Sequence, residues 1–369
     1  MTDLSLPDRT AASSSRIEYI DALRGLTMIL VVFNHVATFV WEIIGTGVPS
    51  VHEYLSQIRM PMFFFISGFV LYKKETVWNG KHICEFLQRK FMVQIIPTII
   101  FLTLFVHVSH LNLEHALFSY AKEGYWFTYI LFQYFLFYAL AKFCFRRYAD
   151  IVMLLAGIAF LPIYHQPITN AIPLPESAKL LLSITYWQYF LFFVIGSSVR
   201  KHFQTVEQWL DSRWLLFGCI ATYFVLNIYR DVLPGHGHGL IGSFLIGLIL
   251  TFSGLTVLFA FFRSNKAHFT KEKFLGRSLQ YIGRRTLDVY LLHYFFLPRE
   301  LGEALPVFKE HPMPVIEAAC SLAIALLIVA CCLLISNIIR LSPILAHYLF
   351  GVKSLPSTAG KEENREKSG

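Results

Sequence analysis

The chain has 369 residues, of which 55% are hydrophobic and only 15% charged, and its mean hydropathy is +0.53. A soluble fold of this length could not bury so much apolar surface, so the composition excludes one and predicts an all-α, polytopic membrane protein. The formal net charge of +8 does not require a nucleic-acid partner, because membrane proteins carry excess Lys and Arg on their cytoplasmic side.

Ten apolar runs are predicted to form a bundle of transmembrane helices. They cover residues 23–44, 54–72, 91–107, 125–143, 151–163, 180–199, 214–229, 240–262, 279–297 and 315–339. The fifth run is short, and the ninth has charged residues in its first half. The polar tails, residues 1–15 and 351–369, are predicted to be disordered and cytoplasmic. Residues 16–350 then form one membrane domain.

The basic residues predict the orientation of this bundle. With the N-terminus inside, 25 of the 32 Lys and Arg residues fall on cytoplasmic segments, while Arg24 lies in the membrane. The remaining six lie outside: Arg59, Lys122, Lys179, Arg230, Arg299 and Lys309. This positive-inside pattern predicts that both termini are cytoplasmic.

The first predicted span carries four polar side chains that are unusual in a membrane helix: Asp21, Arg24, Asn34 and His35. Such groups are costly in hydrocarbon and commonly mark a site or pathway. Arg24 and His35 are eleven residues apart, so they lie within roughly 20° of one helix face, about 16 Å apart along the axis. Asp21 is placed to pair with Arg24. Taken singly, the Arg could snorkel and the His could bond a neighbouring helix, but the pair on one face favours a functional site.

Two pairs of residues near the inner side are candidates for ligand contacts. Ser67 and Gly68 form a small patch in the second span, where a ligand or, more commonly, another helix backbone could approach closely. Arg89 and Lys90 precede the third span and could contact phosphates. The alternative for these two cations is that they only follow the positive-inside rule.

The outer side offers fewer candidates. Arg59 could pair with Glu53 or face an anionic acceptor, and Trp126 could belong to the interfacial aromatic belt or stack on a sugar. His236 and His238 are spaced for metal binding, but the loop LPGHGHG that holds them has no carboxylate or Cys, so no metal site is predicted.

The ninth span holds a second polar group. Thr286, Tyr290 and His293 recur at helical spacing and share a face. Asp288 lies within one turn of the basic pair at residues 284–285, which predicts an ion pair at the inner boundary. For His293, a packing role with a hydrogen bond to another helix and a role in a site are both open.

The segments YIDALRGLTMILVVFNH, MPMFFFISGF, YWF and IGRRTLDVYLLH, in this order over residues 19–293, resemble the acyltransferase type 3 family of membrane proteins. The resemblance implies an enzyme that moves an acyl group, most often acetyl from cytoplasmic acetyl-CoA, to a carbohydrate at the outer face of a bacterial inner membrane. It matches Arg24 and His35 to the family's functional pair. The chain departs from the pattern at Gln94, where relatives often have Arg, and at Tyr125, where a His often precedes the Trp-Phe pair.

General chemistry is compatible with this implied activity. An imidazole has a reference pKa near 6.5 and can accept the proton of a sugar hydroxyl as that hydroxyl attacks a thioester. His35 could act in this way, or it could first carry the acyl group itself. Arg24 could hold a carbonyl or phosphate oxygen of the donor.

The candidate residues fall into three groups: His35 and Arg24 for catalysis; Asp21, Tyr290 and His293 as auxiliary residues; and Ser67, Gly68, Arg89, Lys90 and Trp126 for donor or substrate binding. The implied partners are acyl-CoA, which is a substrate and no permanently bound cofactor, a carbohydrate such as exopolysaccharide, lipopolysaccharide or glucan, and the bilayer. The alternative function is a transporter or exporter of a glycan or small metabolite, although no internal repeat favours it. The sequence leaves the oligomeric state open.

Overall fold

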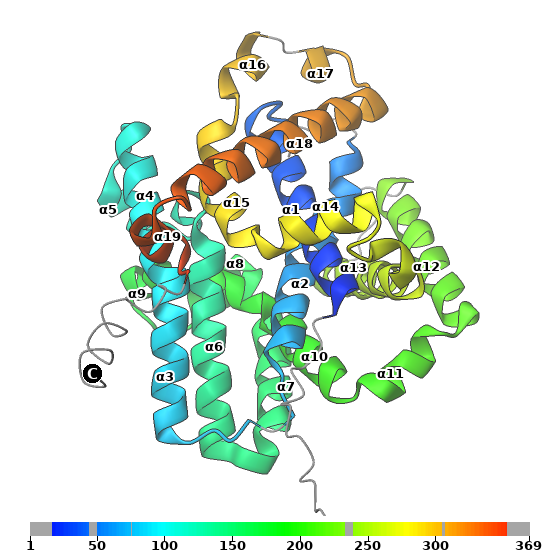
Figure 1. Ribbon diagram of the computed structural model, residues 1–369. Coiled ribbons are helices and arrows are strands. Elements are labelled where there is room, and N and C mark those ends of the chain that lie inside the picture. Colours follow the sequence, from blue (N-terminus) through cyan, green and yellow to red (C-terminus); the bar gives the residue numbers. More distant parts are fainter. Residues whose placement is uncertain (1–16, 44–49, 75, 233–238, 305–306, 353–369) are drawn as a thin grey trace, which may run out of the picture.

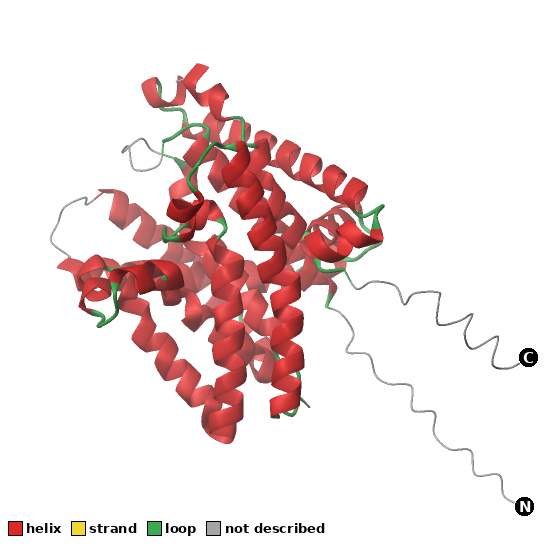
Figure 2. Cartoon of the chain, turned by 90° about the vertical axis from the view of Figure 1, so that its left-hand side faces the viewer, coloured by secondary structure: helices red, strands yellow, loops and turns green. Residues whose placement is uncertain are grey.

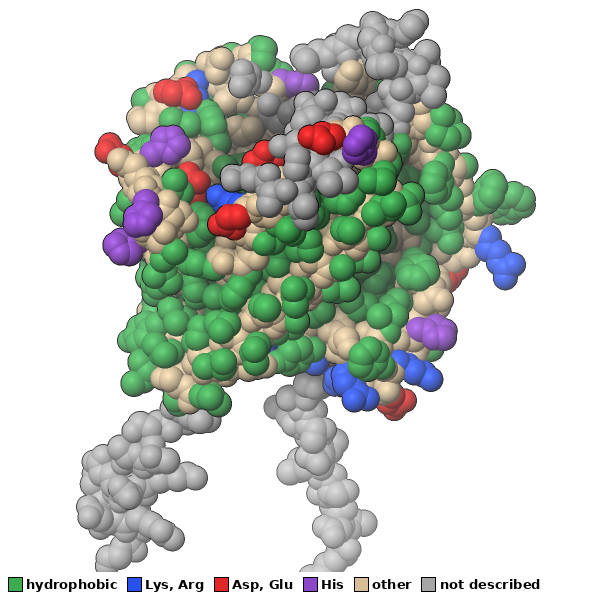
Figure 3. Space-filling view, turned by 90° about the horizontal axis from the view of Figure 1, so that it is seen from above, with side chains coloured by type: hydrophobic (Ala, Val, Ile, Leu, Met, Phe, Trp, Pro, Cys, Tyr) green, Lys and Arg blue, Asp and Glu red, His purple; other side chains and the backbone are tan. Residues whose placement is uncertain are grey.

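The computed structural model describes residues 17–43, 50–74, 76–232, 239–304 and 307–352. In this part of the chain the protein is built from helices and loops and has no strand (Figures 1 and 2). Five helices are long and apolar enough to cross a membrane, and a bent helix pair can add a sixth. Hydrophobic side chains cover much of the face seen in Figure 3. The protein is therefore an all-helical, multi-pass membrane protein, as predicted.

The helices of this bundle, in chain order, have the following bounds. They are α1 (Glu18–Phe39), α2 (Val51–Leu71), α3 (Gly80–Lys90), the π-helical turn η1 (Phe91–Ile95), α4 (Ile96–Val108), α5 (Leu113–Leu117), η2 (Lys122–Gly124), α6 (Trp126–Phe145), η3 (Arg146–Tyr148), α7 (Ala149–Phe160), η4 (Leu161–Tyr164), α8 (Gln166–Ala171), α9 (Glu176–Leu182), η5 (Ile184–Tyr189), α10 (Phe190–Lys201), α11 (Phe203–Leu210), α12 (Arg213–Val232), α13 (Gly239–Ser264), η6 (Lys266–Phe269), α14 (Phe274–Arg284), α15 (Thr286–Leu292), η7 (His293–Phe296), α16 (Arg299–Ala304), α17 (Val307–Glu310), α18 (Pro314–Ile339) and α19 (Pro343–Phe350).

Each of the ten predicted spans overlaps a helix, but the boundaries differ in places. The third begins at Gly80, well before residue 91, because Asn79 caps the helix by accepting a hydrogen bond from the His82 backbone N–H, and Ile83 and Phe86 are buried. The sixth bends by 48° at Ser183, whose backbone is left-handed. The number of crossings and the cytoplasmic placement of both termini stay predictions, and nearly all of both tails lies outside the described residues.

The prediction that residues 279–297 form one continuous helix is wrong. α14 ends at Arg284, α15 begins at Thr286, and a 3-10 turn begins at His293. Arg285, between the two α-helices, has non-helical backbone angles. The break has a packing reason: α14 lies against α1, whereas α15 turns toward α18 (Figure 1).

Two helix contacts centre on glycines that let backbones touch. A Cβ at Gly25 of α1 would lie 2.0 Å from a backbone oxygen of α14, and one at Gly283 of α14 would lie 1.9 Å from a backbone oxygen of α1. Gly68 of α2 and Gly196 of α10 pair in the same way, since a Cβ at either glycine would lie 1.9 Å from a backbone oxygen of the other helix. Close approach of this kind is how small residues associate membrane helices. It fixes α1 and α2, which carry most of the candidate site.

Candidate active site

Arg24 and His35 on α1 both contact the segment that follows the break at Arg285. The Arg24 guanidinium donates a 2.9 Å hydrogen bond to Oγ1 of Thr286, the first residue of α15. The ring of His35 is hydrogen-bonded to His293, the first residue of the turn η7 that follows α15. The structure therefore brings together two polar groups that lie about 260 positions apart in the sequence.

The two histidine rings are joined by a direct hydrogen bond. Nδ1 of His35 lies 2.8 Å from Nε2 of His293, and the rings are nearly parallel, with centroids 4.9 Å apart. Nδ1 of His293 lies 3.1 Å from the backbone oxygen of Val289. Because a carbonyl oxygen can only accept, the neutral His293 carries its proton on Nδ1 and accepts from Nδ1–H of His35 through Nε2. In the neutral pair, Nε2 of His35 is left with its lone pair.

This lone pair faces a tyrosine. The hydroxyl of Tyr294 lies 3.5 Å from Nε2 of His35, at the limit of a hydrogen bond. His293 is fully buried, whereas His35 is only partly buried. The reactive nitrogen of the pair is therefore Nε2 of His35, whose ring is oriented by the hydrogen bond from Nδ1 to His293.

Two other tyrosines form hydrogen bonds that hold α15, the helix that directly precedes His293. The Tyr125 hydroxyl donates to the backbone oxygen of Leu291 at 3.0 Å. The Tyr290 hydroxyl donates to the oxygen of Gly124 at 2.8 Å and accepts from the N–H of Phe127 at 3.1 Å. Both tyrosines thus attach α15 to the start of α6. Tyr290 is an expected site residue with a structural contact, and Tyr125 gains a role that the sequence did not indicate.

A cavity of about 300 Å³ opens at the Arg24 end of α1. Four cationic side chains line it, Arg24, Lys73, Arg89 and Lys90, and its lining includes no Asp or Glu. Gln94 also lines it, and its buried Oε1 has no hydrogen-bond partner within the described residues. The cavity suits an anionic ligand, because Arg and Lys together can contact several phosphate oxygens.

The cavity walls also offer apolar rings. Trp78, Phe86 and Phe135 line it, and the Lys90 ammonium sits 4.0 Å from the centroid of the Phe135 ring. Ser67 is in the lining as well, with its hydroxyl bonded to the Phe63 oxygen at 2.8 Å. A ligand here would find charge and flat apolar surface together.

Three of the expected site residues are not in the lining of this cavity. Gly68 is in the α2–α10 contact and does not line the cavity, which agrees with the packing alternative for this residue. Trp126 is outside the cavity lining, stacked on Tyr186 with centroids 3.7 Å apart. Asp21 is buried in α1, where its backbone oxygen meets Gly283.

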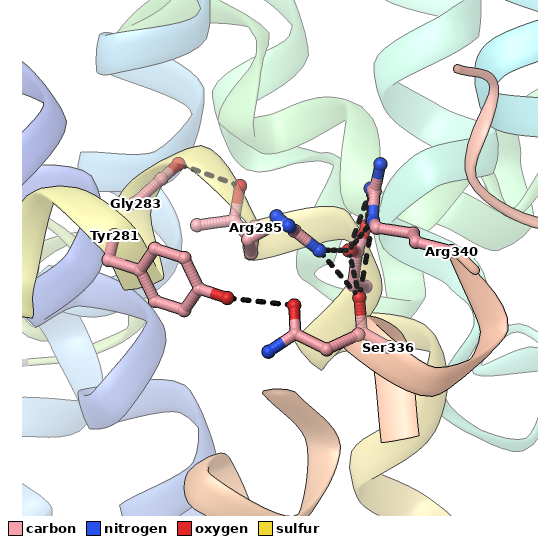
Figure 4. Close-up of polar contacts among 8 residues, drawn as sticks. Tyr281, Gly283, Arg285, Ser336 and Arg340 are labelled. Carbon is pink, nitrogen blue, oxygen red and sulfur yellow. Dashed lines mark hydrogen bonds and ion pairs between the residues drawn. The ribbon is translucent and has the colours of Figure 1, made fainter. Parts of the chain in front are cut away.

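Asp288 forms the predicted ion pair, with an additional partner. Its carboxylate lies 3.3 Å from Arg285, as expected, and 2.8 Å from Arg340 at the end of α18, with Ser336 donating to it at 2.5 Å (Figure 4). Arg340 could not be assigned from the sequence, since it is 52 positions away. The cluster joins α15 to α18 and takes no part in the cavity.

Comparison with known protein families gives one match to the sequence of the chain. The model of an acyltransferase domain, that of acyltransferase type 3, matches residues 17–336 of the chain. No curated protein and no solved structure matches it.

Proposed function

The chain belongs to the acyltransferase type 3 family, and we propose that it moves an acyl group, most often acetyl, from cytoplasmic acyl-CoA to a carbohydrate hydroxyl at the outer face of a bacterial inner membrane. The observation that carries the proposal is the His35–His293 hydrogen bond, which leaves Nε2 of His35 free to accept a proton. The cavity beside Arg24 supports the same conclusion from the donor side.

The cavity suits coenzyme A because its lining combines cationic side chains with apolar rings. Its phosphates would contact Lys73, Arg89 and Lys90, and its adenine would lie against the rings of the lining. Gln94, which stands where relatives often have Arg, offers an unsatisfied acceptor to an amino or amide N–H. In this arrangement Arg24 is the cation nearest to the path toward His35.

His35 then performs the chemistry of transfer. As a general base, its Nε2 takes the proton from the sugar hydroxyl while the hydroxyl oxygen bonds to the thioester carbonyl carbon. The carbon–sulfur bond breaks, and the thiolate of coenzyme A leaves with the proton. As a carrier, Nε2 itself bonds to the acyl carbon first, the carbon–sulfur bond breaks and the thiolate of coenzyme A leaves. The sugar hydroxyl oxygen then bonds to the acyl carbon as the carbon–Nε2 bond breaks, and the hydroxyl proton balances the thiolate, which ends as the thiol. Both routes need the lone pair that His293 directs toward the substrate.

The distance between the two functional residues fits a donor that reaches inward. Arg24 and His35 are eleven residues apart on one helix, about 16 Å along its axis. The donor's phosphates can thus stay at the cationic cavity while the thioester, at the end of a long flexible arm, extends toward His35. The acceptor approaches from the opposite end of α1.

The test is acyl transfer by the purified full-length protein. With labelled acetyl-CoA and a glycan, the wild type should label the glycan. His35→Ala should lose at least a hundredfold in rate, the smallest usual loss for a general base being of this order. The matched control is His107→Ala, since His107 is exposed on α4. A His35→Ala variant that keeps more than about a tenth of the rate, or a wild type that labels no glycan, would overturn the proposal.

A further inference from the structure

Within the part of the chain that the structure describes, Arg59 is a cation without an ion-pair partner. It lies in the first half of α2, and its side chain is partly buried. Its Nε is fully buried and has no hydrogen-bond acceptor, and within the described residues no ion pair includes its guanidinium. The sequence-based alternative of a pair with Glu53 is not realised, because Glu53 is exposed and makes no such contact.

The groups around Arg59 belong to the transfer site. Arg59 lies close enough to His35, Tyr294 and Tyr189 for its charge to act on them, so it is near the reactive nitrogen. His52, seven residues earlier on the same face of α2, is also close, and its buried Nδ1 has no partner either. Two side chains on one face of α2, both near the site, thus carry buried nitrogen atoms that have no hydrogen-bond partner within the described residues.

This space lies away from the donor cavity. α1 and α2 run in opposite directions (Figure 1), so the start of α2 lies beside the His35 end of α1. At the other end, Arg24 of α1 and Ser67 of α2 line the same cavity. None of His52, Arg59 and His35 lines the cationic cavity. Arg59 is therefore placed for the acceptor and not for the phosphates of the donor.

Aromatic rings border the same space. Tyr186 stacks on Trp126 with an interplanar angle of 8°, and Tyr189 stacks 6.1 Å from Trp126. Tyr189 is an electrostatic neighbour of Arg59, and Tyr186 of Tyr294. Flat rings with hydroxyl groups at their edges suit the apolar face and the polar rim of a sugar ring.

An unpaired arginine in this setting has a physical consequence. Charged groups within a membrane protein are normally paired or mark a substrate pathway, because desolvation without a partner is costly. A guanidinium also binds carboxylate and phosphate in a bidentate manner. The partner missing from the protein is then expected to come from the substrate.

We propose that Arg59, with His52 and the rings of Tyr186 and Tyr189, forms an acceptor subsite for a sugar that carries an anionic group, a carboxylate or a phosphate. This inference rests on the proposed function, since it assigns the acceptor of that reaction. It differs from a role in stabilising the oxyanion of the acyl carbon, which would help neutral and anionic acceptors equally.

The proposal is tested by sugar binding, which needs no turnover. Three probes are titrated by calorimetry into the purified full-length protein: methyl glucoside, methyl glucuronide and methyl glucoside 6-phosphate. The wild type should bind at least one anionic probe about tenfold tighter than the neutral one, a difference of roughly 1.4 kcal/mol. Which anion is preferred separates a carboxylate on the sugar from a phosphate.

The matched variants are Arg59→Gln and Arg299→Gln. Arg59→Gln should abolish the preference, keep its affinity for coenzyme A and unfold at no lower temperature, because no protein partner is lost. Arg299→Gln removes an exposed cation that lies over Phe39 and Phe105 and whose charge also acts on Tyr294; it should keep the preference, which shows that a nearby positive charge alone is not enough. A wild type without preference, an Arg59→Gln variant that retains it, or an equal loss in both variants would overturn the subsite. Failure of glycan labelling by the wild type would refute the proposed transfer while leaving this binding result readable.

Discussion

The two ring nitrogens of His35 have different partners, and this difference gives His293 a definable role. His293 accepts from Nδ1, so it keeps the lone pair on Nε2 without touching the reacting atoms. We expect His293→Ala to lower kcat about tenfold, the equivalent of one hydrogen bond, with donor affinity unchanged. His293→Gln should recover part of the rate, since the amide oxygen of Gln can replace the accepting nitrogen. Steady-state kinetics at matched protein amounts will show this, and equal rates for the two variants would contradict a positioning role.

The second prediction concerns Arg24, whose guanidinium has two roles in the structure. It donates to Thr286 and also lines the cationic cavity. An ammonium is a point charge that cannot reproduce this planar geometry. Arg24→Lys should therefore lose most transfer activity and bind coenzyme A more weakly, while inserting normally.

The control for Arg24 is Thr286→Val, which removes only the hydrogen bond. This variant should lose less activity than Arg24→Lys. Near-normal transfer by Arg24→Lys would mean that the residue is a structural cation.

How far the sequence predicts these residues depends on how costly each one is to bury. Arg24, His35 and His293 stand out because each interrupts an apolar run. Tyr125 does not, since aromatic residues are ordinary in membrane helices, and its contact with Leu291 joins segments 166 positions apart. Arg59 was recognised as a candidate, but only the structure shows that it has no partner within the described residues.

At the scale of elements, glycines determine which helices can approach closely. The α2–α10 contact is predicted to fail when Gly68 gains a side chain, because a Cβ would lie 1.9 Å from the Phe193 oxygen. Gly68→Ala should lower the free energy of unfolding by roughly 1–3 kcal/mol, the usual cost of overpacking. Thermal unfolding in detergent measures this.

Gly218 provides the matched control for this change. It also lies inside a helix, α12, but a Cβ there would meet nothing within 4 Å. Gly218→Ala should be neutral or stabilising, because Ala favours the helix over Gly. If Gly68→Ala is equally harmless to stability but lowers affinity for coenzyme A, the ligand-binding interpretation of Gly68 would be the correct one.

Broken helices are the elements that sequence periodicity predicts least well. Residues 279–297 have a continuous apolar pattern, yet the helix stops at Arg284 because α14 follows α1 while the Asp288 cluster holds α15 to α18. That cluster depends on Arg340, a residue of another helix. Periodicity reports which face of a segment is buried, but not where a neighbour forces it to turn.

At the scale of the whole molecule, several helix ends converge on one side of the bundle. Asp150, at the start of α7, pairs with Lys142 near the end of α6 and with Lys201 at the end of α10, at 2.5 and 2.6 Å. Arg200 lies 5.2 Å from the ring of Phe69, near the end of α2. The helices α2, α6 and α10 therefore end on the same side, and α7 starts there, as alternating spans require.

The shared side of these helix ends bears on the question of whether α6 crosses the membrane. α6 has 20 residues, about 30 Å at 1.5 Å per residue, which is enough to cross the hydrocarbon core although it is not one of the five long spans. If it crosses, the loop at Arg146 is cytoplasmic; if it does not, that loop stays on the outer side with Lys122. The basic residues of this loop favour the first arrangement.

Reporter fusions along the chain decide between these arrangements. Fusions after Lys122 and Arg230 are expected to read outside, and a fusion after Arg146 inside, because ten crossings with the N-terminus inside place 25 basic residues on the inner side and only 6 on the outer side. The fusion after Lys122 is the internal control, since it follows the third span whether or not α6 crosses. An outside reading after Arg146 would remove α6 from the spans, and a cytoplasmic reading after Lys122 or Arg230 would refute the ten-span arrangement. In the expected arrangement, the cationic cavity opens toward cytoplasmic acyl-CoA and the Arg59 side of the site toward the outer acceptor, as the proposed transfer demands.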